Sequence, residues 1–458
     1  MKLVDPMDFS INPILANLQG NIIKGHGRDH TTHIFIQFKP NKIIAAKKWL
    51  KSFADEHVTS CKKQLKEREL YNRNKTGGGT FGTVYLTAAG YKYLGFTNVN
   101  TKFSDAAFKA GMKARKAITN DPDKNDWEEG FKNDIHAMVL LADANTIRMA
   151  SIVKDILPAL IKIAAISTIE YGNAIRNANG DGLEHFGYVD GVSQPLFLKD
   201  EVDAYHAFHN TAGNGVNFDP AADTDLVLIP DPYAAKADAA NAFGSYFVFR
   251  KLEQQVRAFK KAEEDLGMGE LGGASLVGRF EDGSPVILDD EDGIIGSGSL
   301  NNFNYNADPS GGRCPHFAHI RKSNPRSSAA DKTHTMARRG IPFGLRNVDT
   351  VIDPAHEQMP ESGVGLLFMS YQKSIENQFE FIQQTWVNDP GFPTGKNTAV
   401  DPIIGQLPVD DHKRSYIFAK EYGGTVLNPK PGKFHQFVTM KGGEYFFAPS
   451  ISFLSGIA

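Results

Sequence analysis

A stretch of basic side chains with two histidines, residues 313–326, reads RCPHFAHIRKSNPR. Its histidines, His316 and His319, are three positions apart, so on a helix both would share one face. A neutral imidazole nitrogen can bind a metal ion or the iron of a porphyrin. A nearby guanidinium such as that of Arg321 suits a carboxylate partner. The alternative is a loop whose histidines are purely structural, and spacing alone favours that alternative.

A second candidate for chemistry is Asp190, in the segment FGYVDGVSQP at residues 186–195. Flanking glycines would hold its carboxylate at the edge of a pocket, where a carboxylate can take up and return a proton. Asp-Gly is also a common turn sequence, so the alternative is that Asp190 only shapes a tight turn.

A third candidate is the arginine pair Arg338 and Arg339, in the segment MARRGIPFG at residues 336–344. One guanidinium that points inward would stabilise negative charge developing in a reaction. The alternative is a surface pair anchored by the apolar residues that follow it. The sequence by itself leaves open which arginine points inward.

The elements that must position these side chains follow a regular order in the first half of the chain. Alternating or continuous apolar runs predict strands, and apolar residues at helical spacing predict helices. These patterns predict strands at 33–38, 80–86, 136–142 and 163–171, with helices at 41–60 and after Asn145. The order β-α-β-β-α-β is that of a ferredoxin-like unit.

The second half repeats this order. Strands are expected at 245–249, 364–371 and 444–448, with helices near 252–259 and 375–386. A long segment rich in Gly, Asn, Ser and Pro, at about 270–361, separates these elements, and segments of that kind are usually functional or disordered. We therefore expect an α+β fold with a first half at 1–203, a connection at 204–240 and a second half at 241–458.

Composition excludes several classes of protein. The net charge of −3 argues against a dedicated nucleic-acid binder, which normally carries a strongly basic face. The two cysteines, Cys61 and Cys314, are too far apart in sequence for a CxxC pair. No apolar run is long enough to cross a membrane, and no secretory signal is visible, so we expect a cytoplasmic protein without a membrane partner.

Together these motifs resemble the dye-decolourising peroxidase family. That family has a GxxDG motif, here Gly187, Asp190 and Gly191, and a later histidine motif that matches AHIRKSNPR and points to His319 rather than His316. Its arginine motif matches RRGIPFG, whose first arginine, Arg338, follows His319 by 338 − 319 = 19 positions. Further matches are NLQGNIIKG, GSYFVFRKLEQ and GLLFMSYQ, so the resemblance extends from about residue 17 to about residue 452.

The resemblance implies a peroxidase with non-covalent haem b in a dimeric α+β barrel-type architecture of two ferredoxin-like halves. His319 would bind the iron, Asp190 would move the peroxide protons, and Arg338 would stabilise the departing oxygen. Hydrogen peroxide and a small aromatic reductant would be the substrates, with bulky phenolic or dye-like donors oxidised in one-electron steps. The alternative is a haem-binding or haem-handling protein, which would have no need of the Asp190–Arg338 pair.

Further roles are implied by matched positions. Leu366 and Phe368 match residues that line the distal pocket in the family, and Arg321 matches a contact to a haem propionate. Trp386 matches an aromatic position in relatives, which predicts an electron relay from bulky donors; the alternative is a buried packing residue.

The sequence departs from the family at the partner of the iron-binding histidine. Many members have Asp in the stretch that reads YQKSIE here, where Ser374 takes that place and Glu376 follows two residues later. A histidine ligand usually gives its second N–H to a carboxylate, a carbonyl or water. We therefore expect Glu376 to accept this hydrogen bond from His319, with Ser374 as the alternative.

Overall fold

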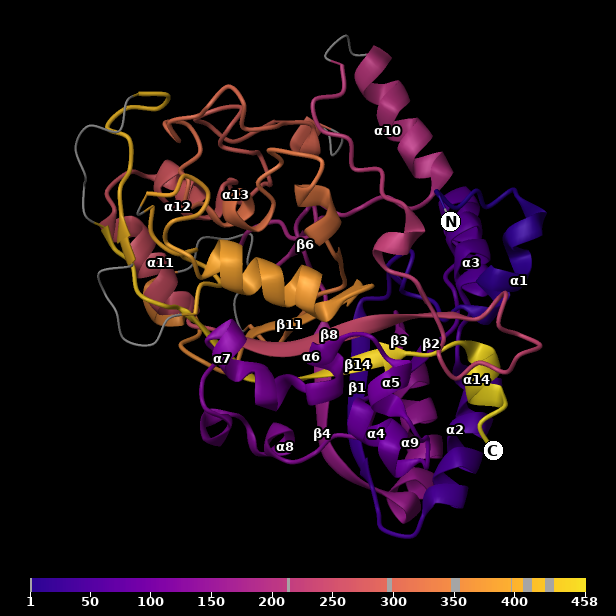
Figure 1. The fold of residues 1–458 in the computed structure, drawn as a ribbon. Coiled ribbons are helices and arrows are strands. Elements are labelled where there is room, and N and C mark those ends of the chain that lie inside the picture. The colour runs from indigo at the N-terminus through magenta and orange to yellow at the C-terminus, as the bar shows by residue number, and fades with distance from the viewer. Residues whose placement is uncertain are drawn as a thin grey trace.

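One antiparallel sheet of ten strands runs through the described part of the chain (Figure 1). The computed structural model describes residues 2–211, 215–294, 299–346, 355–396, 398–406, 414–424 and 432–458. Eight strands follow one path in the order β10-β11-β8-β14-β2-β3-β1-β4, while β7 pairs with β8 and β9 pairs with β11. Each half of the chain contributes four consecutive strands of this path.

The first half is a complete ferredoxin-like unit. Its strands lie in the order β2-β3-β1-β4, and every neighbouring pair is antiparallel. The unit consists of β1 (His30–Phe38), α2 (Ile43–His57), α3 (Cys61–Asn74), β2 (Phe81–Leu86), β3 (Ala137–Asp143), α9 (Thr146–Ile163) and β4 (Ala164–Asn173). The predicted order of strands and helices in this half is confirmed.

The second half repeats the arrangement, with the order β10-β11-β8-β14. It consists of β8 (Phe243–Gln254), α11 (Val256–Asp265), β10 (Ile341–Phe343), β11 (Gly365–Gln372), two π-helical segments (Ile375–Glu380 and Ile382–Val387) and β14 (Val438–Ala448). The strand β10 was not predicted, because three residues are too short to show alternation.

The two halves meet at the middle of the strand path and again where its two outer strands approach each other. Phe447 of β14 pairs with Leu86 of β2. A Cβ atom placed on Gly172 of β4, the last strand of the path, would lie 2.4 Å from Cγ2 of Ile341 in β10, the first strand, so the two outer strands are in close contact. The sheet therefore approaches closure, and the predicted α+β barrel-type architecture of two ferredoxin-like halves is confirmed.

Shorter elements cover the sheet. In Figure 1 the helices α2, α4, α5 and α9 lie on one side of it, and the orange helical segment at 375–387 lies on the opposite side, next to α13. The remaining helices and short strands of the described residues are α1 (Asn12–Asn17), α4 (Ala88–Tyr93), α5 (Val99–Lys102), α6 (Ala106–Ala110), α7 (Lys116–Thr119), α8 (Glu129–Lys132), β5 (Ile175–Arg176), β6 (Gly182–Leu183), α10 (Lys199–Thr211), β7 (Ile229–Pro230), α12 (Glu270–Val277), α13 (His319–Ser323), β9 (Ala337–Arg338), β12 (Ser415–Tyr416), β13 (Gly432–Lys433) and α14 (Ile451–Ser455).

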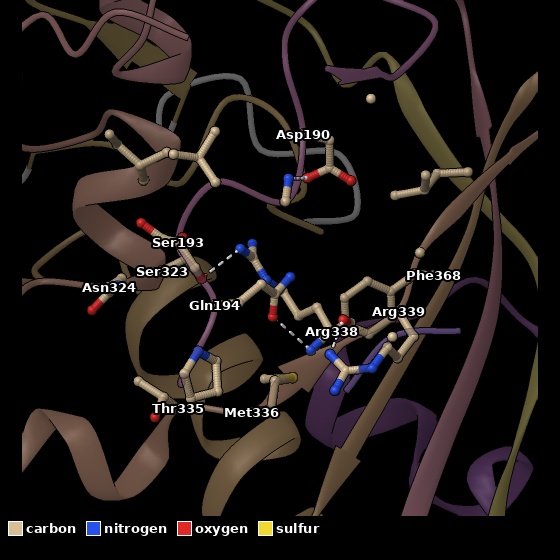
Figure 2. A pocket seen from close by; sticks show the side chains of 18 of the residues that line it. Asp190, Ser193, Gln194, Ser323, Asn324, Thr335, Met336, Arg338, Arg339 and Phe368 are labelled. Carbon is tan, nitrogen blue, oxygen red and sulfur yellow. Dashed lines mark hydrogen bonds between the residues drawn. The ribbon is translucent and has the colours of Figure 1, made fainter. Parts of the chain in front are cut away.

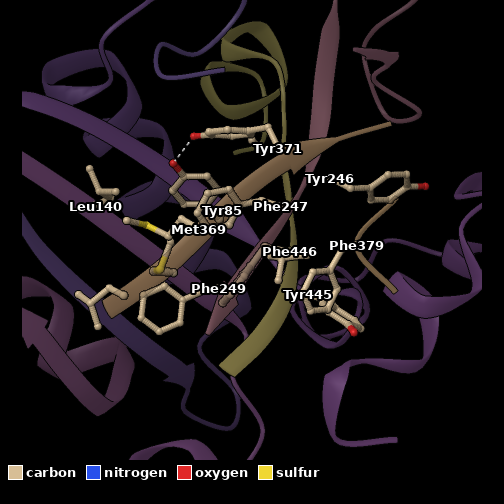
Figure 3. Close-up of a cluster of buried hydrophobic side chains, with 14 of the residues drawn as sticks. Tyr85, Leu140, Tyr246, Phe247, Phe249, Met369, Tyr371, Phe379, Tyr445 and Phe446 are labelled. Carbon is tan, nitrogen blue, oxygen red and sulfur yellow. Dashed lines mark hydrogen bonds between the residues drawn. The ribbon is translucent and has the colours of Figure 1, made fainter. Parts of the chain in front are cut away.

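Aromatic side chains fill the interior between the halves (Figure 3). Tyr85 of β2 and Tyr371 of β11 share a hydrogen bond of 2.5 Å, and the Tyr85 ring stacks on Phe247 of β8 with centroids 4.3 Å apart. Side chains alternate along β11, as expected for a strand. Buried Tyr371 therefore faces the core, whereas half-buried Leu366 and Phe368 face the other side of the sheet.

No helix of the described residues is long and apolar enough to cross a membrane. The cytoplasmic location stays a prediction, as do the domain boundaries at 203 and 240. Parts of the segment at 270–361, residues 295–298 and 347–354, lie outside the described residues.

Candidate active site

A cavity of about 850 Å³ lies between the halves. This volume falls within the range of about 300–1,000 Å³ that is usual for small-molecule and cofactor sites. The first half contributes Asp190 to its lining, and the second half contributes His319, Arg338, Leu366 and Phe368. The three motifs that the sequence singled out thus meet at one cavity.

His319, the first residue of α13, is held by a buried carboxylate. Its Nδ1 donates a hydrogen bond of 2.8 Å to Oδ2 of Asp401, which is fully buried. The other oxygen of Asp401 accepts backbone N–H groups from Ile403 at 2.8 Å and Ile404 at 2.9 Å. Nε2 of His319 has no hydrogen-bond partner among the described residues, and the side chain lines the cavity. The imidazole is therefore fixed with one nitrogen available to a ligand.

The predicted partner, Glu376, is wrong. Its carboxylate accepts the backbone N–H of Ala106 at 3.0 Å and lies 3.4 Å from the guanidinium of Arg115. The alternative, Ser374, donates its hydroxyl to Asp105 at 2.8 Å. Both residues are at the N-terminal end of the helical segment after β11, and that end faces the loop before α6 rather than α13. Asp401 takes the place predicted for them.

His316 is also separate from the site. It precedes α13, so it does not share a helix face with His319. Its Nε2 donates to the carbonyl of Pro309 at 3.2 Å. This arrangement agrees with the choice of His319 in the sequence motif.

Asp190 and Arg338 are linked through one loop (Figure 2). The Asp190 carboxylate accepts the backbone N–H of Gly191 at 2.7 Å. Three residues later, the carbonyl of Ser193 accepts a hydrogen bond of 2.9 Å from Nη2 of Arg338. The next side chain, Gln194, accepts the backbone N–H of Arg338 at 3.1 Å. The loop that presents the acid thus also orients the cation.

The second arginine of the pair, Arg339, is bound to backbone. Its guanidinium donates to the carbonyls of Asn21 at 2.7 Å and Ile22 at 2.9 Å. Burial lowers the pKa of Arg339 to about 10. These contacts fix Arg339 against the N-terminal segment, so Arg338 is the arginine with the geometry expected of the functional group.

Arg321 does not line the cavity. Its guanidinium donates to the side chain and the backbone carbonyl of Asp308, both at 2.7 Å, and lies over the ring of Tyr305 at 4.6 Å. Residues two apart on a helix point in different directions, so Arg321 cannot follow His319 into the cavity. The predicted role of Arg321 beside a haem propionate is wrong.

Two other arginines, which sequence reasoning missed, converge near the cavity on the hydroxyl of Ser193. Arg326 donates to it at 2.6 Å and Arg279 at 3.4 Å. Neither has a carboxylate partner among the described residues, and burial lowers the pKa of Arg279 to about 9 and that of Arg326 to about 10. Arg326 lies in the basic stretch that the sequence singled out, whereas no pattern marked Arg279.

Trp386 is packed among aromatic rings. It is 5% exposed, stacks on Phe392 with centroids 5.4 Å apart and meets Phe381 edge-on. Trp386 does not line the cavity, but Ile382 and Gln383 of the same helical segment do. Its relay role stays a prediction.

The cavity has the residues that a haem requires. One imidazole nitrogen is available, and the lining includes apolar side chains against which a porphyrin can pack: Val277, Leu366, Phe368, Phe379, Ile403 and Ile404. Arginines without carboxylate partners provide positive charge for the carboxylates at the porphyrin edge.

Comparison with known proteins identifies the family. Residues 17–173 match the DyP dimeric alpha+beta barrel domain, and residues 210–399 match the Dyp-type peroxidase C-terminal domain. The chain is 40% identical to the multifunctional dye peroxidase DyP2 of Amycolatopsis sp. over 97% of this chain and 96% of that protein.

Solved structures agree. The Amycolatopsis enzyme superimposes with a TM-score of 0.91 at 39% identity over 99% of both chains. A DyP-type peroxidase of Anabaena sp. superimposes with a TM-score of 0.89 at 38% identity over 100% of this chain and 97% of that chain. The chain belongs to the dye-decolourising peroxidase family, which makes it a haem-dependent peroxidase.

Proposed function

We propose that the cavity holds haem b without a covalent bond, with Nε2 of His319 as the protein ligand to the iron. The observation that carries this proposal is the imidazole of His319, fixed by Asp401 and directed into the cavity shared with Asp190 and Arg338. A carboxylate that accepts the second N–H of a histidine ligand fixes its orientation and raises its basicity. Asp401 is suited to this role because two backbone N–H groups hold its other oxygen.

The proposed contacts to the haem propionates come from Arg326 and Arg279. Both are buried cations without an acid partner among the described residues, so an anionic ligand would offset their unbalanced charge. Replacing Arg326 by Gln is expected to weaken haem binding by about tenfold or more, since a hydrogen bond to a charged group contributes about 1.5–3 kcal/mol. A haem titration of the apoprotein measures this change.

In the proposed reaction, haem held by His319 would supply the iron for hydrogen peroxide and the two electrons that reduce it. Asp190 would take a proton from one oxygen of the peroxide and return it to the other, which would leave as water. Arg338 stabilises the negative charge that develops on the departing oxygen. Its hydrogen bond to the Ser193 carbonyl holds the guanidinium in place before the reaction begins.

We propose that bulky phenolic and dye-like molecules return the electrons one at a time. A dye-decolourising peroxidase that is 26% identical, with a TM-score of 0.78, was solved in complex with 2,6-dimethoxyphenol. Leu366 and Phe368 line the cavity. Donors too bulky to enter it would transfer electrons through Trp386.

The state of the cofactor is tested by extraction. If the haem is haem b without a covalent bond, acidified organic solvent removes all of it from the purified protein, and the extract has the absorption spectrum of free protoporphyrin iron. Haem that stays with the precipitated protein would contradict the proposal.

A further inference from the structure

The turn that leads to Asp190 is anchored to the second half. Phe186 stacks on Phe259 of α11 with centroids 3.9 Å apart and an interplanar angle of 14°. The hydroxyl of Tyr188 donates to Glu263 at 2.6 Å. These contacts place the backbone of the turn, but they leave its own N–H groups to be satisfied within the loop.

One carboxylate, that of Glu184, accepts two of those N–H groups. Its Oε2 accepts the backbone N–H of Phe186 at 2.9 Å, and its Oε1 accepts that of Tyr188 at 3.0 Å. Glu184 also lines the cavity. It therefore closes the turn that precedes Asp190 and is exposed to the same cavity.

Gln254, at the end of β8, completes the arrangement. Its amide nitrogen donates to Oε2 of Glu184. Its buried Oε1 has no hydrogen-bond partner among the described residues. If the amide rotates, Oε1 of Gln254 faces Glu184 and can accept a hydrogen bond from the protonated carboxyl group of Glu184. The pair thus has a complete hydrogen bond whether Glu184 is ionised or neutral.

Burial favours the neutral form of Glu184. Burial, with a smaller contribution from the neighbouring carboxylate of Asp190, raises the pKa of Glu184 to about 7, against the hydrogen bonds that it accepts. Arg346 is a cation near Glu184, and its charge favours the ionised form. Burial lowers the pKa of the adjacent His185 to about 4, so the imidazole of His185 is neutral. Near neutral pH, Glu184 therefore changes charge beside Asp190.

We propose that Glu184 is a positioning residue for the peroxide reaction: it holds the turn that carries Asp190, and while neutral it adds no negative charge to the cavity. The inference rests on the proposed role of Asp190. As pH rises and Glu184 ionises, its negative charge opposes the charge that develops on the departing oxygen. The peroxide reaction is then expected to slow on the order of tenfold, which corresponds to about 1.4 kcal/mol.

The charge is tested by stopped-flow mixing with peroxide between pH 5 and pH 9. The wild-type rate is expected to fall through an inflection near pH 7, and Glu184→Gln is expected to remove this inflection. The same inflection in both proteins would overturn the assignment of the charge to Glu184. If Asp190→Asn reacts at the wild-type rate, the role of Asp190 itself is wrong.

The two hydrogen bonds from the turn to the Glu184 carboxylate are tested separately, by hydrogen exchange of the purified protein at one pH. Glu184→Leu removes both acceptor oxygens, so the amides of Phe186 and Tyr188 are expected to exchange about tenfold faster or more. Glu184→Gln keeps one acceptor oxygen and is expected to lie between Glu184→Leu and the wild type. Glu264→Gln is the control, because its carboxylate is 70% exposed on the neighbouring α11. Unchanged exchange in both Glu184 variants would overturn the positioning role without any bearing on haem or peroxide.

Discussion

Nδ1 of His319 donates a hydrogen bond of 2.8 Å to Asp401, a residue 82 positions later in the chain. The carboxylate is fully buried and held by two backbone N–H groups, so its direction is fixed independently of the imidazole. This pairing places Asp401 where it can control the electron donation of a histidine ligand.

Replacing Asp401 by Asn is expected to raise the Fe(III)/Fe(II) potential of the haem-loaded protein. A neutral amide makes the imidazole a weaker donor, which disfavours the ferric state. We expect a rise of about 60 mV or more, corresponding to a tenfold change in a one-electron equilibrium. Spectroelectrochemical titration measures it. Glu376→Gln is the matched control and should leave the potential unchanged; a shift with Glu376→Gln alone would refute the pairing.

The residues of short local motifs could be predicted from the sequence, and the partner of His319 could not. Asp190 and Arg338 stand in segments whose few residues both form the loop and carry the function. Asp401 follows the helical segment after β11, and no local pattern links it to His319. Glu376 was chosen because it is the acid nearest to the expected position, but the start of its helix faces Asp105.

The sequence also did not predict which arginine of the basic stretch at residues 313–326 points toward the cavity. Arg321 and Arg326 lie in one basic stretch, and the sequence motif pointed to Arg321 alone. The helix α13 directs Arg321 to Asp308, whereas Arg326 follows the helix with a positive φ of 54° and reaches Ser193. The duplicated fold was predictable because apolar periodicity marks most strands and helices of each half. The strand β10 was missed because it is only three residues long.

Replacing either Asp190 or Arg338 is expected to slow the reaction with peroxide while haem stays bound. Asp190→Asn should slow the step by about 10²–10⁴-fold, because a positioned proton-transfer group is lost. Arg338→Leu should slow it by about 10²–10³-fold, because the charge on the departing oxygen loses its donor. Stopped-flow absorbance after mixing with peroxide measures both. Asp203→Asn, at a carboxylate 58% exposed on α10, is the control and should react normally. Wild-type rates in both cavity variants would mean that other residues perform the step.

Trp386→Phe is expected to slow the oxidation of bulky dyes and to leave small phenols unchanged. Phenylalanine keeps the stacking on Phe392 but cannot be oxidised as readily as an indole. Steady-state rates with one donor of each size measure the effect. Equal losses for both donors would indicate a packing role, which the 5% exposure of Trp386 also allows.

The folded protein is expected to lose stability as pH falls below about 6.5, in part through His33. This residue is fully buried in β1, and burial lowers its pKa from 6.5 to about 4. The unfolded state therefore binds a proton between these values that the folded state does not. At pH 5 the contribution is about 2 kcal/mol, since one pKa unit corresponds to about 1.4 kcal/mol.

Thermal melts of the haem-free protein at pH 7 and pH 5 test this expectation. His33→Leu should lose less stability between the two pH values than the wild type, and His57→Leu, at a partly exposed helix end, should behave like the wild type. An unchanged pH dependence in His33→Leu would contradict the account of His33.

The central claim, that His319 is the protein ligand to the iron, is tested most directly by the absorption spectrum of haem-loaded variants. His319→Ala should lose most of its haem, and His316→Ala should keep it with a wild-type spectrum that changes rapidly after one equivalent of peroxide. Full haem retention in His319→Ala together with loss in His316→Ala would contradict the claim.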